Sequence, residues 1–252
     1  MSIKIIDQLN ENLLRQAFDG NVVTDMERYY RHIAAMYSAM ENSIAVLSNM
    51  KESQSYIYYG GAGERLGIAN KGDIHEIHSI WEEEILSHVY PSDLISKQLQ
   101  ELHFFHFVKS QPTNCRHDYC MESTLRMSDA DGNLHPMSHR IFYFSPQDSE
   151  SLHFALCIYN FTTQATNQSG HIINTATGDV IQLLPRDFLS PLSERETEIL
   201  KLIAYGKRSK EIAESLHISI NTVNRHRQNI LEKLNVSNSM EACNLAQRLQ
   251  LI

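Results

Sequence analysis

The sequence has few of the features that mark secreted or membrane proteins. Its 252 residues include four cysteines in no regular spacing, which is typical of a chain kept in a reducing compartment. No apolar run approaches the roughly 18 residues of a membrane-spanning helix. The first residues, Met-Ser-Ile-Lys-Ile-Ile-Asp, lack the apolar core of a signal peptide. We therefore expect a cytoplasmic protein with no membrane partner.

Motifs of common enzymes are also missing. The chain has 13 histidines, yet none lies in an HExxH motif, and no serine lies in a nucleophile elbow. The glycine-rich stretch Gly60–Gly63 is one residue off a dinucleotide-binding fingerprint and is not followed by the GK[ST] of a phosphate-binding loop. We interpret it as a sharp turn where a strand leaves a sheet, because positive φ angles favour glycine. We expect no catalysis and no catalytic residues.

Three groups of residues have spacings that metal ligands use. They are His75-x-x-His78, His103-x-x-His106 and Cys115-x-His117-x-x-Cys120. A closed zinc site usually requires two paired Cys or His doublets, and here each group is an isolated fragment. Packing or surface positions are the simpler interpretation. We therefore expect no metal site, and the sequence identifies no cofactor.

Charge is distributed unevenly along the chain. The net charge is −8, but residues 191–252 carry nine Lys or Arg and seven Glu, about +2, which leaves about −10 for the preceding part. A chain of this length fits two domains. In the basic part, Lys207, Arg208 and Lys210 lie together, and such local clustering is what neutralises nucleic-acid phosphates.

The last sixty or so residues have the pattern of short helices. The capping box Ser193–Glu196 predicts the first helix, and Ser209 is expected to cap a second. After the link His217-Ile218, Ser219 caps a third helix over residues 219–234. Two short helices joined by a tight turn form a helix-turn-helix, in which the later helix enters the major groove of DNA.

The third helix has two different faces. The packed face consists of Val223, Ile230, Leu234 and the stem of Arg227, which recur at steps of three and four. The opposite face consists of Asn221, Asn224, Arg225 and Gln228. Because their donors and acceptors match base edges, we expect this face to read DNA sequence.

Six short motifs cover this region with almost no gaps. They are Leu192-Ser193-x-Arg195-Glu196-x-Glu198-Ile199-Leu200, Ile203-Ala204-x-Gly206, Lys210-Glu211-Ile212-Ala213, Ile218-Ser219-x-x-Thr222-Val223-x-x-His226, Ile230-x-x-Lys233-Leu234-x-Val236 and Glu241-Ala242. Together they resemble the LuxR/NarL-type (GerE-like) helix-turn-helix domain of transcriptional regulators. The resemblance spans about 60 residues and implies a four-helix domain over residues 191–252 that binds double-stranded DNA as a dimer.

The resemblance also implies roles for single residues. The base-reading residues are expected to be Asn224, Arg225 and Gln228. The phosphate-contacting residues, taken with the clustered basic charges, are expected to be Lys210, Thr222, His226, Arg227 and Lys233. The last helix would form the dimer contact through Ala242, Cys243, Ala246 and Leu249. Many members of the family carry Lys where this chain has Asn224, so the operator sequence does not transfer.

The N-terminal part begins with helical patterns over residues 1–40 and then alternates with a period of two. The alternation predicts five strands, at residues 44–47, 56–59, 119–127, 134–144 and 152–161. Helices are predicted between the second and third strands, over residues 74–88 and from Tyr90-Pro91-Ser92-Asp93 to about Lys109. A polar linker with a further hairpin follows over residues 164–190.

This succession, with the Tyr90–Asp93 segment and the hairpin turn Asp129–Asn133, resembles a PAS domain over residues 41–163. The resemblance implies a five-stranded antiparallel sheet with helices on one face, and a role in sensing ligands or in dimerisation. The expected fold class is thus α+β, a PAS-like domain followed by an all-α helix-turn-helix domain.

We therefore expect a homodimeric transcription regulator that binds DNA and responds to a small-molecule ligand or protein partner at the N-terminal domain. RNA polymerase is a further candidate partner. The main alternative is an N-terminal interaction module without a ligand. An acyl-homoserine-lactone receptor is a weaker alternative, because Trp81 is the single tryptophan and such receptors use a characteristic Trp, Tyr and Asp set. A phosphorylated receiver domain is disfavoured, because its strand-end acidic pair is missing.

Overall fold

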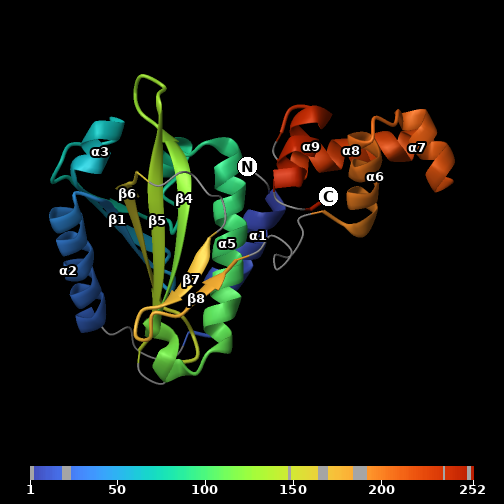
Figure 1. The fold of residues 1–252 in the computed structure, drawn as a ribbon. Helices are drawn as coiled ribbons and strands as arrows, with labels where there is room; N and C mark the ends of the chain where they lie inside the picture. Colours follow the sequence, from blue (N-terminus) through green and yellow to red (C-terminus); the bar gives the residue numbers. More distant parts are fainter. Residues whose placement is uncertain are drawn as a thin grey trace. The chain divides into compact units, whose positions relative to one another are not determined.

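The computed structural model describes residues 3–18, 24–146, 149–163, 170–183, 192–234, 236–248 and 251–252. The chain divides into two compact units, an N-terminal unit of residues 10–183 and a C-terminal unit of residues 184–252 together with residues 1–9. Figure 1 labels the elements of both units. Every helix in the described ranges is too short or too polar to cross a bilayer.

One antiparallel sheet of eight strands organises the N-terminal unit. In chain order the elements up to residue 183 are α1 (Ile3–Leu14), which belongs to this unit only from Asn10 onward, α2 (Thr24–Glu41), β1 (Ile44–Asn49), β2 (Gln54–Tyr59), α3 (Gly61–Leu66), β3 (Ile74–Ile77), α4 (Glu83–Ser87), α5 (Pro91–Ser110), the 3₁₀ helix η1 (Thr113–Asp118), β4 (Tyr119–Ser128), β5 (Leu134–Phe144), β6 (Phe154–Phe161), β7 (His171–Asn174) and β8 (Val180–Gln182). Across the sheet the strands run in the order β3-β2-β1-β6-β5-β4-β7-β8.

The five strands predicted from the alternating pattern are present as β1, β2, β4, β5 and β6. The expected total of five is wrong, because further strands extend both sides of this group. On one side β3 pairs with β2, and on the other side β7 pairs with β4 and with β8. The helix predicted over residues 74–88 is also wrong in its first part, since Ile74–Ile77 forms β3. Pairing with β2 gives this segment a ladder of hydrogen bonds that its local helical pattern does not reveal.

Helices cover both faces of the sheet, not the one face that was expected. Figure 1 shows α2 and α5 on opposite sides of the strands. On the face toward α2, Ala34 of that helix packs in an apolar cluster with the strand residues Ala45, Leu47, Tyr56, Tyr58, Phe154, Leu156 and Ile158. The other face receives α5, where the ring of Phe104 stacks on Tyr143 with centroids 5.3 Å apart. Because side chains alternate along a strand, each central strand contributes to both layers.

The glycine-rich stretch after β2 is not the positive-φ turn that was expected. Gly60 has a φ of −88°, and α3 begins directly after it. Glycine is needed here for space, because a Cβ at position 60 would lie 2.5 Å from the carbonyl carbon of Asn42. Close backbone approach therefore explains this glycine without any phosphate ligand.

The described residues from 192 to 248 contain the four helices that the sequence predicts: α6 (Glu194–Ala204), α7 (Ser209–Leu216), α8 (Ile220–Leu234) and α9 (Ser239–Arg248). The predicted capping box of α6 is present. The Glu196 N–H donates to Ser193 Oγ at 3.3 Å, and the Ser193 N–H donates to Glu196 Oε2 at 2.8 Å. The cap of α7 is Arg208 rather than Ser209, with the Arg208 N–H bound to Glu211. The apolar side chains of α6, α7, α8 and α9 are buried together in one core. Its residues are Leu192, Ile199, Leu200, Ile212, Ala213, Val223, Ile230, Leu234, Ala242, Cys243, Leu245 and Ala246.

Candidate DNA interface

The helix-turn-helix consists of α7, a three-residue turn and α8. The turn begins at His217, which adopts a left-handed backbone conformation with a φ of +52°. The guanidinium of Arg195 on α6 donates a hydrogen bond of 2.9 Å to the carbonyl oxygen of Leu216, the last residue of α7. Such a bond satisfies a carbonyl that helix geometry leaves open and fixes α7 to α6.

Ser219 caps α8, as predicted from the sequence. Its hydroxyl oxygen accepts the backbone N–H of Thr222 at 3.0 Å and lies 2.8 Å from the Thr222 hydroxyl. The remaining N–H groups of the first turn point along the helix axis toward solvent and give this end a partial positive charge. The start of α8 is therefore suited to a phosphate oxygen.

The two faces of α8 are arranged as its periodicity predicts. Val223, Ile230 and Leu234 are at most 1% exposed. On the opposite side Asn224, Arg225 and Gln228 are all exposed. Since the buried face is anchored in the core of the C-terminal unit, the outward amides and guanidinium stand on a rigid support.

Two of the residues expected to contact phosphates, Arg227 and Lys233, bind other side chains of the C-terminal unit instead. Arg227 donates to Ser209 Oγ at 3.0 Å and to Ser239 Oγ at 2.9 Å, which links α8 to the starts of α7 and α9. The Lys233 ammonium forms an ion pair with Glu196 of the α6 capping box. Both side chains thereby position α8 in the unit, a role that its helical pattern alone does not indicate.

The ion pair with Lys233 affects the pKa of its partner, Glu196. Burial alone would raise the pKa of the Glu196 carboxyl, but the hydrogen bonds from Lys233 and from the Ser193 backbone outweigh burial and hold this pKa below its usual value. Glu196 is 3% exposed, so its charge is screened little by solvent. The N-terminus of α6 and the C-terminal half of α8 are therefore held together by one carboxylate.

The other expected phosphate ligands have different surroundings. Lys210 at the start of α7 and Thr222 in the first turn of α8 are exposed. His226 is half-buried, and its Nδ1 atom is buried without a hydrogen-bond partner among the described residues. Lys210 and Thr222 are thus the members of the set whose polar atoms face solvent.

The small residues of α9 face inward. Ala242 and Ala246 have no exposed surface, and Cys243 is 8% exposed with its Sγ 4.0 Å from the carbonyl oxygen of Leu200 on α6. These residues fill the core of their own protomer, so they offer no surface to a second copy. Leu249 lies outside the described residues. The exposed side of α9 carries Met240, Asn244 and Gln247.

A second group of polar side chains lies buried in the N-terminal unit, between α5 and the sheet. The Lys97 ammonium is 2.7 Å from Glu101 Oε1, and the Tyr159 hydroxyl donates to Glu82 Oε1 at 2.6 Å. Burial would lower the pKa of Lys97, but the carboxyls of Glu101 and Glu82 outweigh burial and raise it. Burial raises the pKa of Glu101, against the attraction of Lys97. The group thus contains two carboxyl groups and one ammonium.

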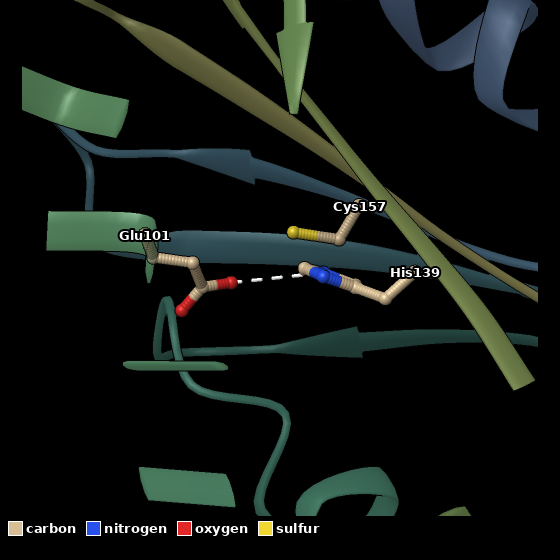
Figure 2. Close-up of side chains that lie close together, drawn as sticks. All are labelled: Glu101, His139 and Cys157. Carbon is tan, nitrogen blue, oxygen red and sulfur yellow. Dashed lines mark ion pairs between the residues drawn. The ribbon is translucent and has the colours of Figure 1, made fainter. Parts of the chain in front are cut away.

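His139 and Cys157 complete this buried polar cluster, part of which is drawn in Figure 2. Burial, together with Lys97, holds the pKa of His139 well below its usual value. Burial, with the carboxyls of Glu82 and Glu101, raises the pKa of the Cys157 thiol. A cavity of about 30 Å³ adjoins the cluster and is lined by Leu13, Ser48, Met50, Ile80, Trp81, Glu82, Lys97, Glu101, Ile141, Tyr143, Ala155 and Cys157. No motif in the sequence predicts a site at these cluster residues.

Residues 190–246 match the model of a family described as bacterial regulatory proteins of the luxR family. This stretch contains the whole helix-turn-helix and the stripe of small residues on α9. The C-terminal part of the chain is therefore a LuxR-family helix-turn-helix domain, as its motifs predict.

Curated relatives match a short part of the chain. The transcriptional regulatory protein LiaR of Bacillus subtilis is 52% identical over 61 residues, which are 24% of this chain and 29% of LiaR. DesR, also a transcriptional regulatory protein of Bacillus subtilis, is 51% identical over 53 residues, 21% of this chain and 27% of DesR. The response regulatory protein YgeK of Escherichia coli is 50% identical over 58 residues, 23% of this chain and 40% of YgeK. The chain thus spans less than half the length of these relatives.

Two solved structures align with most of the chain at low similarity. A Vibrio cholerae VqmA dimer, described as a LuxR-type receptor, aligns over 90% of this chain and 87% of its own, with 15% identity and a TM-score of 0.28. Escherichia coli SdiA aligns over 99% and 98% of the two chains, with 16% identity and a TM-score of 0.24. Both scores are too low to assign a shared overall fold.

Proposed function

We propose that the protein is a sequence-specific DNA-binding transcription regulator that inserts α8 into the major groove. The single observation that carries this proposal is the exposed polar face of α8, held by a buried apolar face within a LuxR-family domain. The relatives LiaR and DesR, which share this domain, are transcriptional regulatory proteins.

The proposed contacts follow from exposure. Asn224, Arg225 and Gln228 read bases, because their side chains reach solvent from one face of α8 and can pair with base edges. Lys210 and Thr222 contact phosphates beside the N-terminus of α8. Half-buried His226 is a weaker candidate for the same role. Arg227 and Lys233 support binding by fixing α8, since their charged groups are bound to other side chains of the unit.

The test compares Arg225→Ala with Lys201→Ala, which removes an equal charge from the exposed surface of α6. Operators are first selected from random DNA with the wild-type protein. In titrations against the selected operator and random DNA, Arg225→Ala should weaken operator binding by about 1–3 kcal/mol and relax base preference. Lys201→Ala should leave both affinities near the wild-type values. Equal losses for both variants on both DNAs would contradict a base-reading α8.

Lys210→Ala tests the phosphate contacts in the same titrations at several salt concentrations. Since Lys210 is proposed to neutralise one phosphate, its removal should weaken operator and random DNA alike. It should also flatten the dependence of log affinity on log salt by roughly one unit. An unchanged salt slope would contradict this assignment.

We further propose that the protein acts as a homodimer, with part of the contact on α2. Its side chains Tyr29, Met36 and Met40 are 62%, 51% and 76% exposed and recur along the outer side of the helix. Such a stripe of large apolar side chains is typical of a surface that another chain covers. The inward-facing small residues of α9 make that helix a poorer candidate for the contact.

The N-terminal unit is proposed to control DNA binding through a signal or partner. Its five central strands keep the succession that suggests a PAS domain, although three more strands extend the sheet. The cavity beside α5 measures about 30 Å³. Pockets for organic ligands measure about 300–1,000 Å³, so this cavity does not fit an acyl-homoserine lactone. A wider hollow of about 410 Å³, lined by Glu41, Asn42, Gly61, Ala62, Arg65, Asn160 and Phe161, is open to solvent. An interaction module without an organic ligand therefore remains the main alternative.

A further inference from the structure

Three side chains of the buried polar cluster converge from different elements. Glu101 comes from α5, His139 from β5 and Cys157 from β6, and Figure 2 shows their functional atoms turned toward one another. One potential ligand atom from each lies within 4.8 Å of the other two. The register places His139 opposite Tyr159, so that Cys157 lies two residues along β6 on the same face. Sheet register and helix packing together thus assemble three ligand types at one point.

His139 has an unusual environment for a buried histidine. It has no exposed surface, and neither of its ring nitrogens has a hydrogen-bond partner among the described residues. The nearest carboxylate oxygen, Glu101 Oε1, lies 3.6 Å from Nε2, too far for a hydrogen bond. An unsatisfied buried polar group costs about 1–3 kcal/mol. A ligand at Nε2 would remove this cost.

The spacing suits a small ion. Tetrahedral zinc bonds of about 2.0–2.3 Å separate neighbouring ligand atoms by roughly 3.3–3.8 Å. The 3.6 Å between His139 Nε2 and Glu101 Oε1 falls in this interval. The Cys157 sulfur lies within 4.8 Å of both of these atoms, close enough to join them around one ion.

The charges also favour a cation. Glu82 and Glu101 are 4% exposed and Lys97 is 3% exposed, so two buried carboxyl groups face one buried ammonium. When both carboxyls are ionised, the cluster has a net charge of −1. A divalent cation bound by a Cys157 thiolate adds +1 to that total, so the loaded cluster is neutral. Neutrality matters here because an unbalanced charge in the interior is costly.

The adjoining cavity has space for a water molecule as a fourth metal ligand. Its volume of about 30 Å³ exceeds the roughly 10–15 Å³ that a cavity needs to hold one water molecule, and Glu101 and Cys157 form part of its wall. A zinc site with three protein ligands normally takes a water molecule as the fourth. The cavity therefore has room for this ligand but not for an organic molecule.

We propose that Glu101, His139 and Cys157 form a binding site for one divalent transition-metal ion, with Zn²⁺ as the best match. Thiolate and imidazole ligands select zinc-like ions over Mg²⁺ and Ca²⁺. On binding, the Cys157 thiol loses its proton to solvent as the metal–sulfur bond forms, and no oxidation or reduction is involved. This inference concerns the N-terminal unit alone, so it stands or falls separately from DNA binding.

Lys97 does not block the proposed site. Its ammonium binds Glu101 Oε1, but an ionised carboxylate offers about four acceptor positions on its two oxygens. One carboxylate can therefore bind the ammonium and the metal together. In this arrangement Lys97 orients the Glu101 ligand, as outer hydrogen-bond partners commonly do at metal sites.

The test uses the whole 252-residue chain, stripped with a chelator and titrated with Co²⁺, which takes the place of Zn²⁺ and absorbs visible light. We expect one tightly bound Co²⁺ per chain and a thiolate-to-cobalt charge-transfer absorption, both displaced by Zn²⁺. Elemental analysis of the protein after purification in the presence of Zn²⁺ should likewise give one metal ion per chain.

Cys157→Ser is the informative variant, and Cys120→Ser is its matched control, because Cys120 is also buried in the sheet but lies on β4 outside the cluster. Cys157→Ser should lose the charge-transfer absorption, and Cys120→Ser should keep it. Zn²⁺ should raise the melting temperature of the wild type and of Cys120→Ser but not that of His139→Ala.

Three results would overturn the proposal: no stoichiometric Co²⁺ uptake by the wild type, uptake without thiolate absorption, or an absorption that Cys157→Ser retains. Should Cys157→Ser fail to fold, Glu101→Gln replaces it. That variant keeps the thiolate signal but should weaken Co²⁺ binding at least tenfold, and an unchanged affinity would also overturn the site.

Discussion

Single side chains of the C-terminal unit fall into two groups, those that face solvent and those that hold helices together. Arg225 belongs to the first group and Lys233 to the second, although both are basic residues of α8. Removing Lys233 leaves the buried Glu196 carboxylate without its cation. We therefore expect Lys233→Ala to lower the free energy of unfolding of this unit by about 1–3 kcal/mol in urea denaturation. Lys201→Ala, which removes an exposed cation, should have little effect.

The same ion pair predicts a pH dependence. The pKa of Glu196 is lower in the folded than in the unfolded chain, so folding favours its ionised form. This stabilisation is full above the unfolded pKa, about 4.3, and is lost as the pH falls through the folded pKa. The free energy of unfolding should therefore decrease in acid more steeply for the wild type than for Glu196→Gln. Parallel pH profiles of the two proteins would contradict this account.

The position of a residue could be predicted from the sequence where it depends only on neighbouring residues in the same helix. The exposed and buried faces of α8 follow from helix geometry alone, so periodicity is enough to assign Val223 and Arg225 to different faces. Lys233 and Glu196 lie 37 positions apart, and no periodicity connects them. The cluster residues Glu101 and Cys157 come from a helix and a strand that meet only in the folded unit, so composition and spacing could not group them.

At the scale of helices, the start of α8 is fixed by a side-chain cap. Ser219→Ala removes the acceptor of the Thr222 N–H and should lower the free energy of unfolding of the C-terminal unit by about 1 kcal/mol. Ser219→Gly should cost a few tenths of a kcal/mol, because glycine is tolerated at this position. Urea denaturation of the two variants measures the difference. An alanine variant as stable as the wild type would show that the cap contributes nothing.

At the scale of strands, alternation located β1, β2, β4, β5 and β6 but missed β3. The residues Ile74–Ile77 fit the first turn of a helix equally well, and their pairing with Ser55–Tyr58 decides the outcome. Pairing partners distant in sequence are invisible to local patterns, which is also why the positions of β7 and β8 beside β4 were not predicted.

At the scale of the whole molecule, the exposed stripe on α2 predicts the oligomeric state. Met36→Glu introduces a charge into the proposed contact and should shift the protein from dimer to monomer in sedimentation analysis at micromolar concentration. Arg28→Gln changes the charge of α2 by the same amount at an exposed position away from the stripe, and it should remain dimeric. A Met36→Glu protein that remains dimeric would exclude α2 as the main contact.

Both outer strands of the eight-stranded sheet are short, four residues in β3 and three in β8. An outer strand offers unpaired backbone groups to which a neighbouring molecule can add a strand of its own. Val180 and Ile181 on β8 are exposed and apolar, so a longer β8 would favour pairing with a strand of another molecule at this edge of the sheet. We therefore expect the short length of these strands to limit association through the sheet edges, and an insertion that lengthened β8 to promote fibril-like association.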